Sequence, residues 1–158
     1  GGDPNAFVLM GHSAGAHLVG LVATMPDIAR DAGVAPWRGN VLLDGGAIDT
    51  VKTMQARWKP QLFADAFGDD PTYWRNASPM HRLNGKIAPT LAVCASERAD
   101  SCPNNTAFLR KAREYGTRTQ LLAKPMSHRD INRDLGEDNA YTREVEAFIR
   151  DIGVPLGG

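Results

Sequence analysis

The sequence lacks an apolar run long enough for a transmembrane helix, and it contains no low-complexity segment or internal repeat. It also lacks net charge, because 18 basic residues balance 18 acidic ones. This balance favours neither nucleic acid nor a membrane surface as a partner. With 158 residues and 42% hydrophobic content, the chain is expected to form one globular domain, 1–158, around a substantial core.

Cysteine is scarce: Cys94 and Cys102 are the only two. Their separation fits neither a zinc site nor a redox C-x-x-C motif. The four histidines form no H-E-x-x-H motif, so we expect no metal ion and no other cofactor. Cys94 lies in an apolar run and is interpreted as a buried free thiol, with a disulfide to Cys102 as the less favoured alternative.

The most informative stretch is Gly-His-Ser-Ala-Gly at positions 11–15, between a short apolar run and a helix-like segment. A strand, G-x-S-x-G and a helix together are typical of the nucleophile elbow of a serine hydrolase. Gly11 and Gly15 are expected to supply the room that such a sharp turn requires. Ser13 would be the nucleophile, and the backbone N–H of Ala14, at the start of the helix, would stabilise an oxyanion.

Elsewhere, apolar runs alternate with segments of helical periodicity. This alternation predicts an α/β fold with a parallel sheet of about four strands, flanked by helices on both sides. The five aromatic residues at positions 58, 63, 67, 73 and 74 are expected mostly to pack helices on the sheet rather than to form a pocket wall. We expect strands at 6–10, 40–44, 88–95 and 118–123, helices at 14–25, 51–58, 60–67, 72–76, 106–115 and 141–152, and irregular structure at 78–86, 96–105 and 124–134.

A serine nucleophile needs a base, and in a parallel sheet such groups gather in loops after the strands. His128 follows the fourth predicted strand and is the predicted base. Three other histidines are expected to have structural roles. His12 would pack or line the pocket, His17 would be buried with a hydrogen-bond partner, and His81 would lie at the surface.

The base in turn needs a carboxylate that orients it. Three acids are candidates, and we rank Asp100 first, Glu97 second and Asp49 third. Asp100 and Glu97 follow the third predicted strand, which gives the chain order Ser, acid, His of this hydrolase architecture. Asp49 follows the second strand. Helix capping is the structural alternative for Asp100 and Asp49.

The segment G-H-S-A-G-A-H-L, from Gly11 to Leu18, resembles the esterase and arylformamidase-like branch of the α/β-hydrolase superfamily. The likeness continues through Ala77-Ser78-Pro79 and Ser127-His128 and extends over nearly the whole chain. It implies a triad of Ser13, Asp100 and His128, with Ala14 as an oxyanion donor. It also implies hydrolysis of small-molecule carboxylic esters through an acyl-enzyme, or alternatively an arylformamidase-type cleavage of amides.

Members of this superfamily have further N-terminal strands and an H-G-G loop before the elbow. Here the elbow comes almost at once, in a chain that begins at Gly1 and shows no signal-peptide pattern. We therefore expect a partial α/β-hydrolase fold, the C-terminal part of a larger protein. A non-catalytic half-domain that needs its missing part is the alternative from a different functional class.

Overall fold

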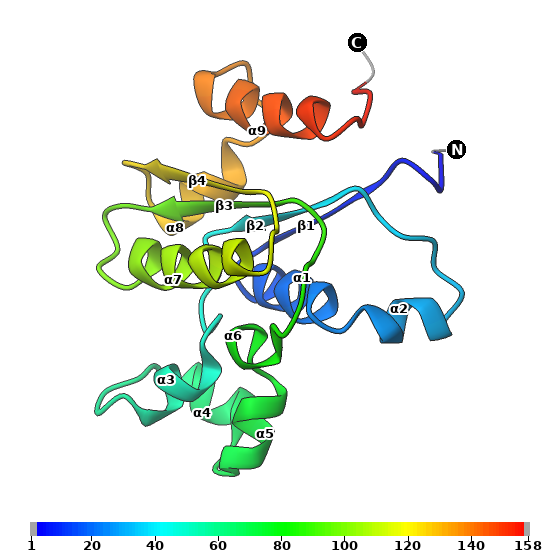
Figure 1. Ribbon diagram of the computed structural model, residues 1–158. Helices are drawn as coiled ribbons and strands as arrows, with labels where there is room; N and C mark the ends of the chain where they lie inside the picture. The colour runs from blue at the N-terminus through cyan, green and yellow to red at the C-terminus, as the bar shows by residue number, and fades with distance from the viewer. Residues whose placement is uncertain (1–2, 157–158) are drawn as a thin grey trace.

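The computed structural model describes residues 3–156, and its centre is a four-stranded parallel sheet (Figure 1). The strands are β1 (Val8–His12), β2 (Gly39–Leu43), β3 (Thr90–Ala95) and β4 (Thr119–Lys124). They lie side by side in chain order, β1-β2-β3-β4, and every neighbouring pair is parallel. The predicted α/β class and four-stranded parallel sheet are confirmed. All carboxyl ends therefore lie at one edge of the sheet.

Helices cover both faces of this sheet, as the alternating pattern predicts. Helices α1 (Ala14–Ala23) and α7 (Ser101–Glu114) lie against one face, while α8 (His128–Arg133) and α9 (Ala140–Asp151) lie on the other (Figure 1). Each face has its own apolar cluster, with Phe108 in one and Phe148 in the other. Strands β2 and β3 are buried along their whole length, so packing on both faces fixes the positions of the residues that follow them.

Five short helices complete the chain. α2 (Pro26–Asp31) follows α1, and a helical excursion between β2 and β3 comprises α3 (Thr50–Gln55), α4 (Gln61–Phe67), α5 (Pro71–Asn76) and α6 (Pro79–Arg82) (Figure 1). Three of them begin at a side-chain cap, because Asp49, Asp70 and Ser78 each accept a backbone N–H from the first turn. None of the helices within residues 3–156 is long and apolar enough to cross a bilayer.

Three segments predicted to be irregular contain helix. Residues 78–86 include α6, residues 124–134 include α8, and α7 begins at Ser101, five residues before the predicted start. Two of these helices, α6 and α8, are too short to show apolar periodicity. They begin where the N-cap hydroxyls of Ser78 and Ser127 accept a backbone N–H from the first turn. The first turn of α7 is polar, so its apolar face becomes visible only further along the chain.

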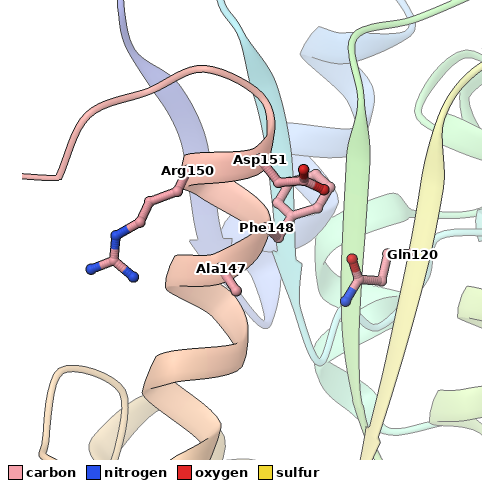
Figure 2. Close-up of a pocket in the computed structure, with 5 residues that line it drawn as sticks. All are labelled: Gln120, Ala147, Phe148, Arg150 and Asp151. Carbon is pink, nitrogen blue, oxygen red and sulfur yellow. The ribbon is translucent and has the colours of Figure 1, made fainter.

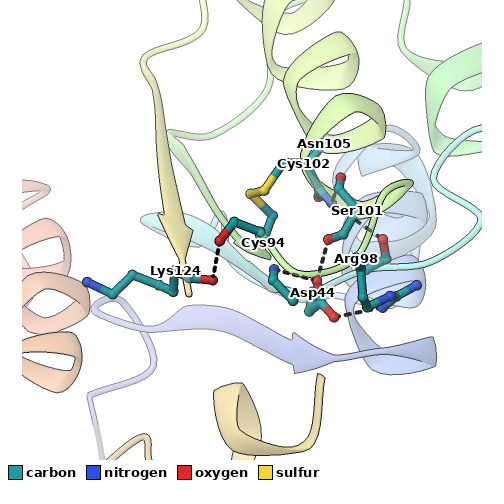
Figure 3. Close-up of a disulfide and its surroundings, with 10 residues drawn as sticks. Asp44, Cys94, Arg98, Ser101, Cys102, Asn105 and Lys124 are labelled. Carbon is teal, nitrogen blue, oxygen red and sulfur yellow. Dashed lines mark hydrogen bonds and ion pairs between the residues drawn. A yellow bond between two sulfur atoms is a disulfide. The ribbon is translucent and has the colours of Figure 1, made fainter. Parts of the chain in front are cut away.

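The structure joins Cys94, on β3, to Cys102, in the first turn of α7, by a disulfide that spans 5.1 Å between Cα atoms (Figure 3). The interpretation of Cys94 as a free thiol is therefore wrong. Cys94 is buried, as the apolar run indicates, but α7 begins earlier than predicted and brings Cys102 to the Cys94 sulfur. The bond closes the loop that connects β3 to α7.

Candidate functional site

Ser13 occupies the turn between β1 and α1, with φ of 57° and ψ of −116°. This left-handed region is unfavourable for a residue with a Cβ, and such strain costs about 1–3 kcal/mol. The expected strand, turn and helix arrangement is present. The turn is held to the sheet because the Ser13 N–H donates to the Leu43 carbonyl at 2.9 Å.

The two glycines that flank the motif are not equivalent. A Cβ on Gly11 would lie 2.4 Å from the carbonyl carbon and oxygen of Gly15, so nothing larger than glycine fits there. A Cβ on Gly15 would meet no other atom of residues 3–156 within 4 Å. The expectation that the turn needs both glycines is therefore correct for Gly11 and wrong for Gly15, since the close contact involves Gly15's backbone rather than its missing side chain.

His128, the first residue of α8, makes a close contact with a carboxylate that the sequence-based ranking leaves out. Its Nδ1 lies 2.5 Å from Oδ2 of Asp44, the residue that follows β2. Nδ1–H donating to this oxygen leaves Nε2 unprotonated, which is the tautomer a general base requires. Asp44 itself is completely buried and has a positive φ of 49°, a conformation that aspartate tolerates better than most residues.

The loop after β3 satisfies the remaining capacity of the Asp44 carboxylate (Figure 3). Its Oδ1 accepts the Ala95 N–H at 2.8 Å and the Ser101 hydroxyl, and its Oδ2 accepts Arg98 Nη1–H at 2.7 Å. Burial raises the pKa of Asp44, but hydrogen bonds from these groups and from His128 outweigh it, so the pKa lies below its ordinary value. Asp44 is therefore a charged, immobile carboxylate.

None of the three acids ranked from the sequence contacts His128. The Asp100 side chain is 61% exposed, and its Oδ2 accepts Arg98 Nη2–H at 3.2 Å. Glu97 is exposed, and Asp49 caps α3 and lies 3.3 Å from His81 Nε2. Among residues 3–156 no hydrogen bond joins Asp100 to the imidazole. The structure therefore places Asp100 against Arg98, and it brings Asp44, not Asp100, to the imidazole.

The other histidines are structural, as predicted. The His12 ring packs on that of His128 at 4.4 Å between centroids, and its Nε2 lies 2.8 Å from the His128 carbonyl oxygen. His17 is buried, and its Nε2 lies 2.7 Å from the Ala77 carbonyl oxygen. Burial lowers the pKa of His17, and the hydrogen bond to Ala77 offsets this effect only in part. The folded protein therefore disfavours the protonated form of His17.

Ser13, Ala14 and His128 line one cavity of about 810 Å³. The expectation that the central aromatic residues mostly pack on the sheet is wrong for Trp58, Phe63 and Phe67, which line this cavity. No hydrogen bond links Ser13 Oγ to His128 in the described part of the chain. The apolar wall comes from the α3–α4 region and comprises Trp58, Pro60, Leu62, Phe63, Ala66 and Phe67.

A second hollow, of about 480 Å³, lies between α9 and β4 (Figure 2). It is lined by Gln120, Phe148 and Asp151 together with their neighbours, and by none of the predicted site residues. Within residues 3–156 no cluster of three His, Cys, Asp or Glu side chains could hold a metal ion. The cavity at Ser13 is therefore the candidate site.

Comparison with solved structures identifies the fold. The chain is similar to an esterase of the planctomycete Thermogutta terrifontis with butyrate bound, with a TM-score of 0.68, 20% identity and coverage of 95% of this chain and 58% of that one. For a variant of esterase rPPE the values are 0.64, 18%, 95% and 52%, and for a hormone-sensitive lipase from a metagenome library they are 0.64, 19%, 94% and 54%. No protein-family model and no curated protein sequence matches the chain significantly.

The class defined by these likenesses is the α/β-hydrolase fold, which confirms the predicted resemblance at the level of fold. The chain spans between 52% and 58% of the lengths of these three proteins.

The glycine asymmetry predicts opposite effects of two alanine substitutions. Gly11→Ala places a methyl group against backbone atoms and should lower the free energy of unfolding by about 1–3 kcal/mol. Gly15→Ala meets open space on a helix and should be neutral or stabilising by up to about 1 kcal/mol. Urea denaturation followed by circular dichroism measures both. Equal losses in the two variants would contradict this assignment.

The lowered pKa of His17 predicts a stability change with pH. As the pH falls below about 6.5, the unfolded chain binds a proton more readily than folded His17 does, so the free energy of unfolding decreases. The contribution of Asp44 to stability is lost only below about pH 4, outside the range from pH 5.0 to pH 7.5 compared below. His17→Gln retains an amide donor near the Nε2 position and should show a smaller drop in melting temperature between pH 7.5 and pH 5.0. The same drop in both proteins would rule out His17 as the cause.

Proposed function

We propose that this chain holds the catalytic centre of a serine hydrolase of carboxylic esters, with Ser13 as nucleophile, His128 as base and Asp44 as the acid. The observation that supports it most directly is the Asp44–His128 contact of 2.5 Å at the cavity that Ser13 also lines. The esterase and lipase names of the proteins with similar folds favour the same chemistry. Asp44 replaces Asp100 in this proposal because Asp100 does not reach the imidazole.

In the proposed reaction, His128 Nε2 takes the proton of Ser13 Oγ while the oxygen attacks the ester carbonyl carbon. The carbonyl electrons move to the oxygen, and the backbone N–H of Ala14 donates to this oxyanion at the start of α1. Collapse breaks the ester C–O bond, and His128 gives its proton to the departing alcohol. Water then releases the acid from the acyl-enzyme by the same steps. Asp44 stabilises the imidazolium in both halves.

The cavity wall indicates the substrate class. Its apolar residues favour an uncharged acyl or aryl group, and a volume of about 810 Å³ accommodates a small molecule. The similar Thermogutta terrifontis esterase binds butyrate, which suggests short acyl chains here as well. The arylformamidase-type alternative would place a formyl amide at the same nucleophile, and it uses the same proton transfers.

Labelling with a fluorophosphonate tests the proposal directly, because the probe reacts only with an activated serine. We expect stoichiometric labelling at Ser13, identified by peptide mass spectrometry. Ser13→Ala should abolish both labelling and hydrolysis of p-nitrophenyl butyrate. Ser96→Ala provides the control, because Ser96 is exposed and its hydroxyl donates only to the Lys124 carbonyl, and this variant should still label at Ser13.

A folded protein that is not labelled at Ser13 would contradict the proposal and favour the non-catalytic half-domain instead. Parallel assays with p-nitrophenyl butyrate and a formanilide separate the two hydrolytic activities. Faster turnover of the formanilide, lost in Ser13→Ala, would replace the esterase proposal by the arylformamidase one.

A further inference from the structure

Arg98 lies at the centre of a small charge cluster beside the proposed catalytic pair. Its Nη1 is 2.7 Å from Asp44 Oδ2 and 3.0 Å from His128 Nδ1. Its Nη2 donates to Asp100 Oδ2 at 3.2 Å. Figure 3 shows the guanidinium beside the Asp44 carboxylate, and Arg98 lies in the middle of the loop that the disulfide closes. One carboxylate oxygen is thus shared by an arginine and a histidine.

Because Arg98 and His128 share this oxygen, the charge of Arg98 affects the protonation of the imidazole. Arg98 is always charged and can only donate hydrogen bonds. When His128 Nδ1 carries its proton, that proton and the Arg98 N–H both point at Asp44 Oδ2. A second positive charge on His128 then lies about 3 Å from the first, and one oxygen of the buried carboxylate faces both of them. The charge of Arg98 therefore opposes the imidazolium that Asp44 stabilises.

We infer that Arg98 is a positioning residue for the proposed base: it fixes Asp44 against His128 and weakens the hold of His128 on a proton. This inference rests on the proposed function. The effect returns His128 to its neutral, proton-accepting form after each transfer. Asp100, on the other guanidinium nitrogen, offsets little of this effect because its carboxylate is exposed and screened by solvent.

Other charged and titratable groups near His128 could also affect its protonation. His12 on β1 packs on its ring, and Asp130 on its own helix is engaged by Ser127 and Arg133. Neither group touches the Asp44 carboxylate. Among residues 3–156, the titratable or charged groups in contact with the imidazole are therefore His12, Asp44 and Arg98, while Asp100 contacts Arg98 and Asp130 lies on the first turn of α8.

NMR titration of the His128 ring tests the inference without requiring turnover. The signal is assigned by its absence in His128→Gln. In Arg98→Met, which keeps an apolar stem of similar length without the charge, the titration midpoint of His128 should move to higher pH by about 0.5 unit or more. Arg98→Lys keeps the charge and should move the midpoint less. Arg143→Met is the matched control, because Arg143 is an exposed arginine on α9 that pairs with Asp138. This variant should leave the His128 midpoint unchanged.

The acidic limb of kcat/KM for p-nitrophenyl butyrate should move in the same direction in Arg98→Met. An unchanged His128 midpoint in a folded Arg98→Met protein would overturn the inference, even if the rate falls. Should Arg98→Met not fold, Arg98→Gln decides by the same titration. Absence of Ser13-dependent hydrolysis in the unmutated protein would instead overturn the proposed function, while the NMR result still reports on Arg98.

Discussion

The buried carboxylate of Asp44 is the constraint on which the site depends. Placing a charged group where no side-chain surface is exposed costs several kcal/mol unless donors surround it. Here the donors come from two segments far apart in sequence: Ala95, Arg98 and Ser101 after β3, and His128 after β4. A change in either segment would leave this charge unsatisfied, so the fold and the position of the proposed base are tied together.

The connection from β3 to α7 is the second element of this arrangement. The disulfide joins its ends, and between them lie three of the donors to Asp44. Because the sheet is parallel and its strands follow chain order, this loop lies between the residues after β2 and those after β4. The loop predicted to supply the acid therefore supplies hydrogen-bond donors to Asp44, the proposed acid.

Much of this could be predicted from the sequence, because local patterns determine it. The sheet follows from alternating apolar runs, and the positions of Ser13 and His128 follow from the motif and from the rule that site residues come after strands. The same rule applied to β2 would have indicated Asp44, a carboxylate directly after a fully buried strand. Chain order favours Asp100 instead, because it indicates where a residue falls along the chain and not which side chain turns inward.

The remaining differences depend on tertiary contacts. The close approach of Gly11 to the Gly15 backbone requires the turn in three dimensions, and the hydrogen bonds of Arg98 require three loops at once. Trp58 is the same kind of case: it is 80% exposed and lines the cavity rather than the core. Amphipathic periodicity shows which helix faces are apolar, but not whether such a face covers the sheet or a cavity.

The most direct test of this account compares Asp44→Asn with Asp100→Asn by steady-state hydrolysis of p-nitrophenyl butyrate, with circular dichroism to verify folding. Removing the charge that orients the base and stabilises its protonated form should lower kcat by about 10⁴ in Asp44→Asn. Asp100→Asn should remain within a few-fold of the unmutated protein, because its carboxylate is exposed and contacts only Arg98. A large loss in Asp100→Asn together with a small one in Asp44→Asn would contradict the assignment of Asp44 as the acid.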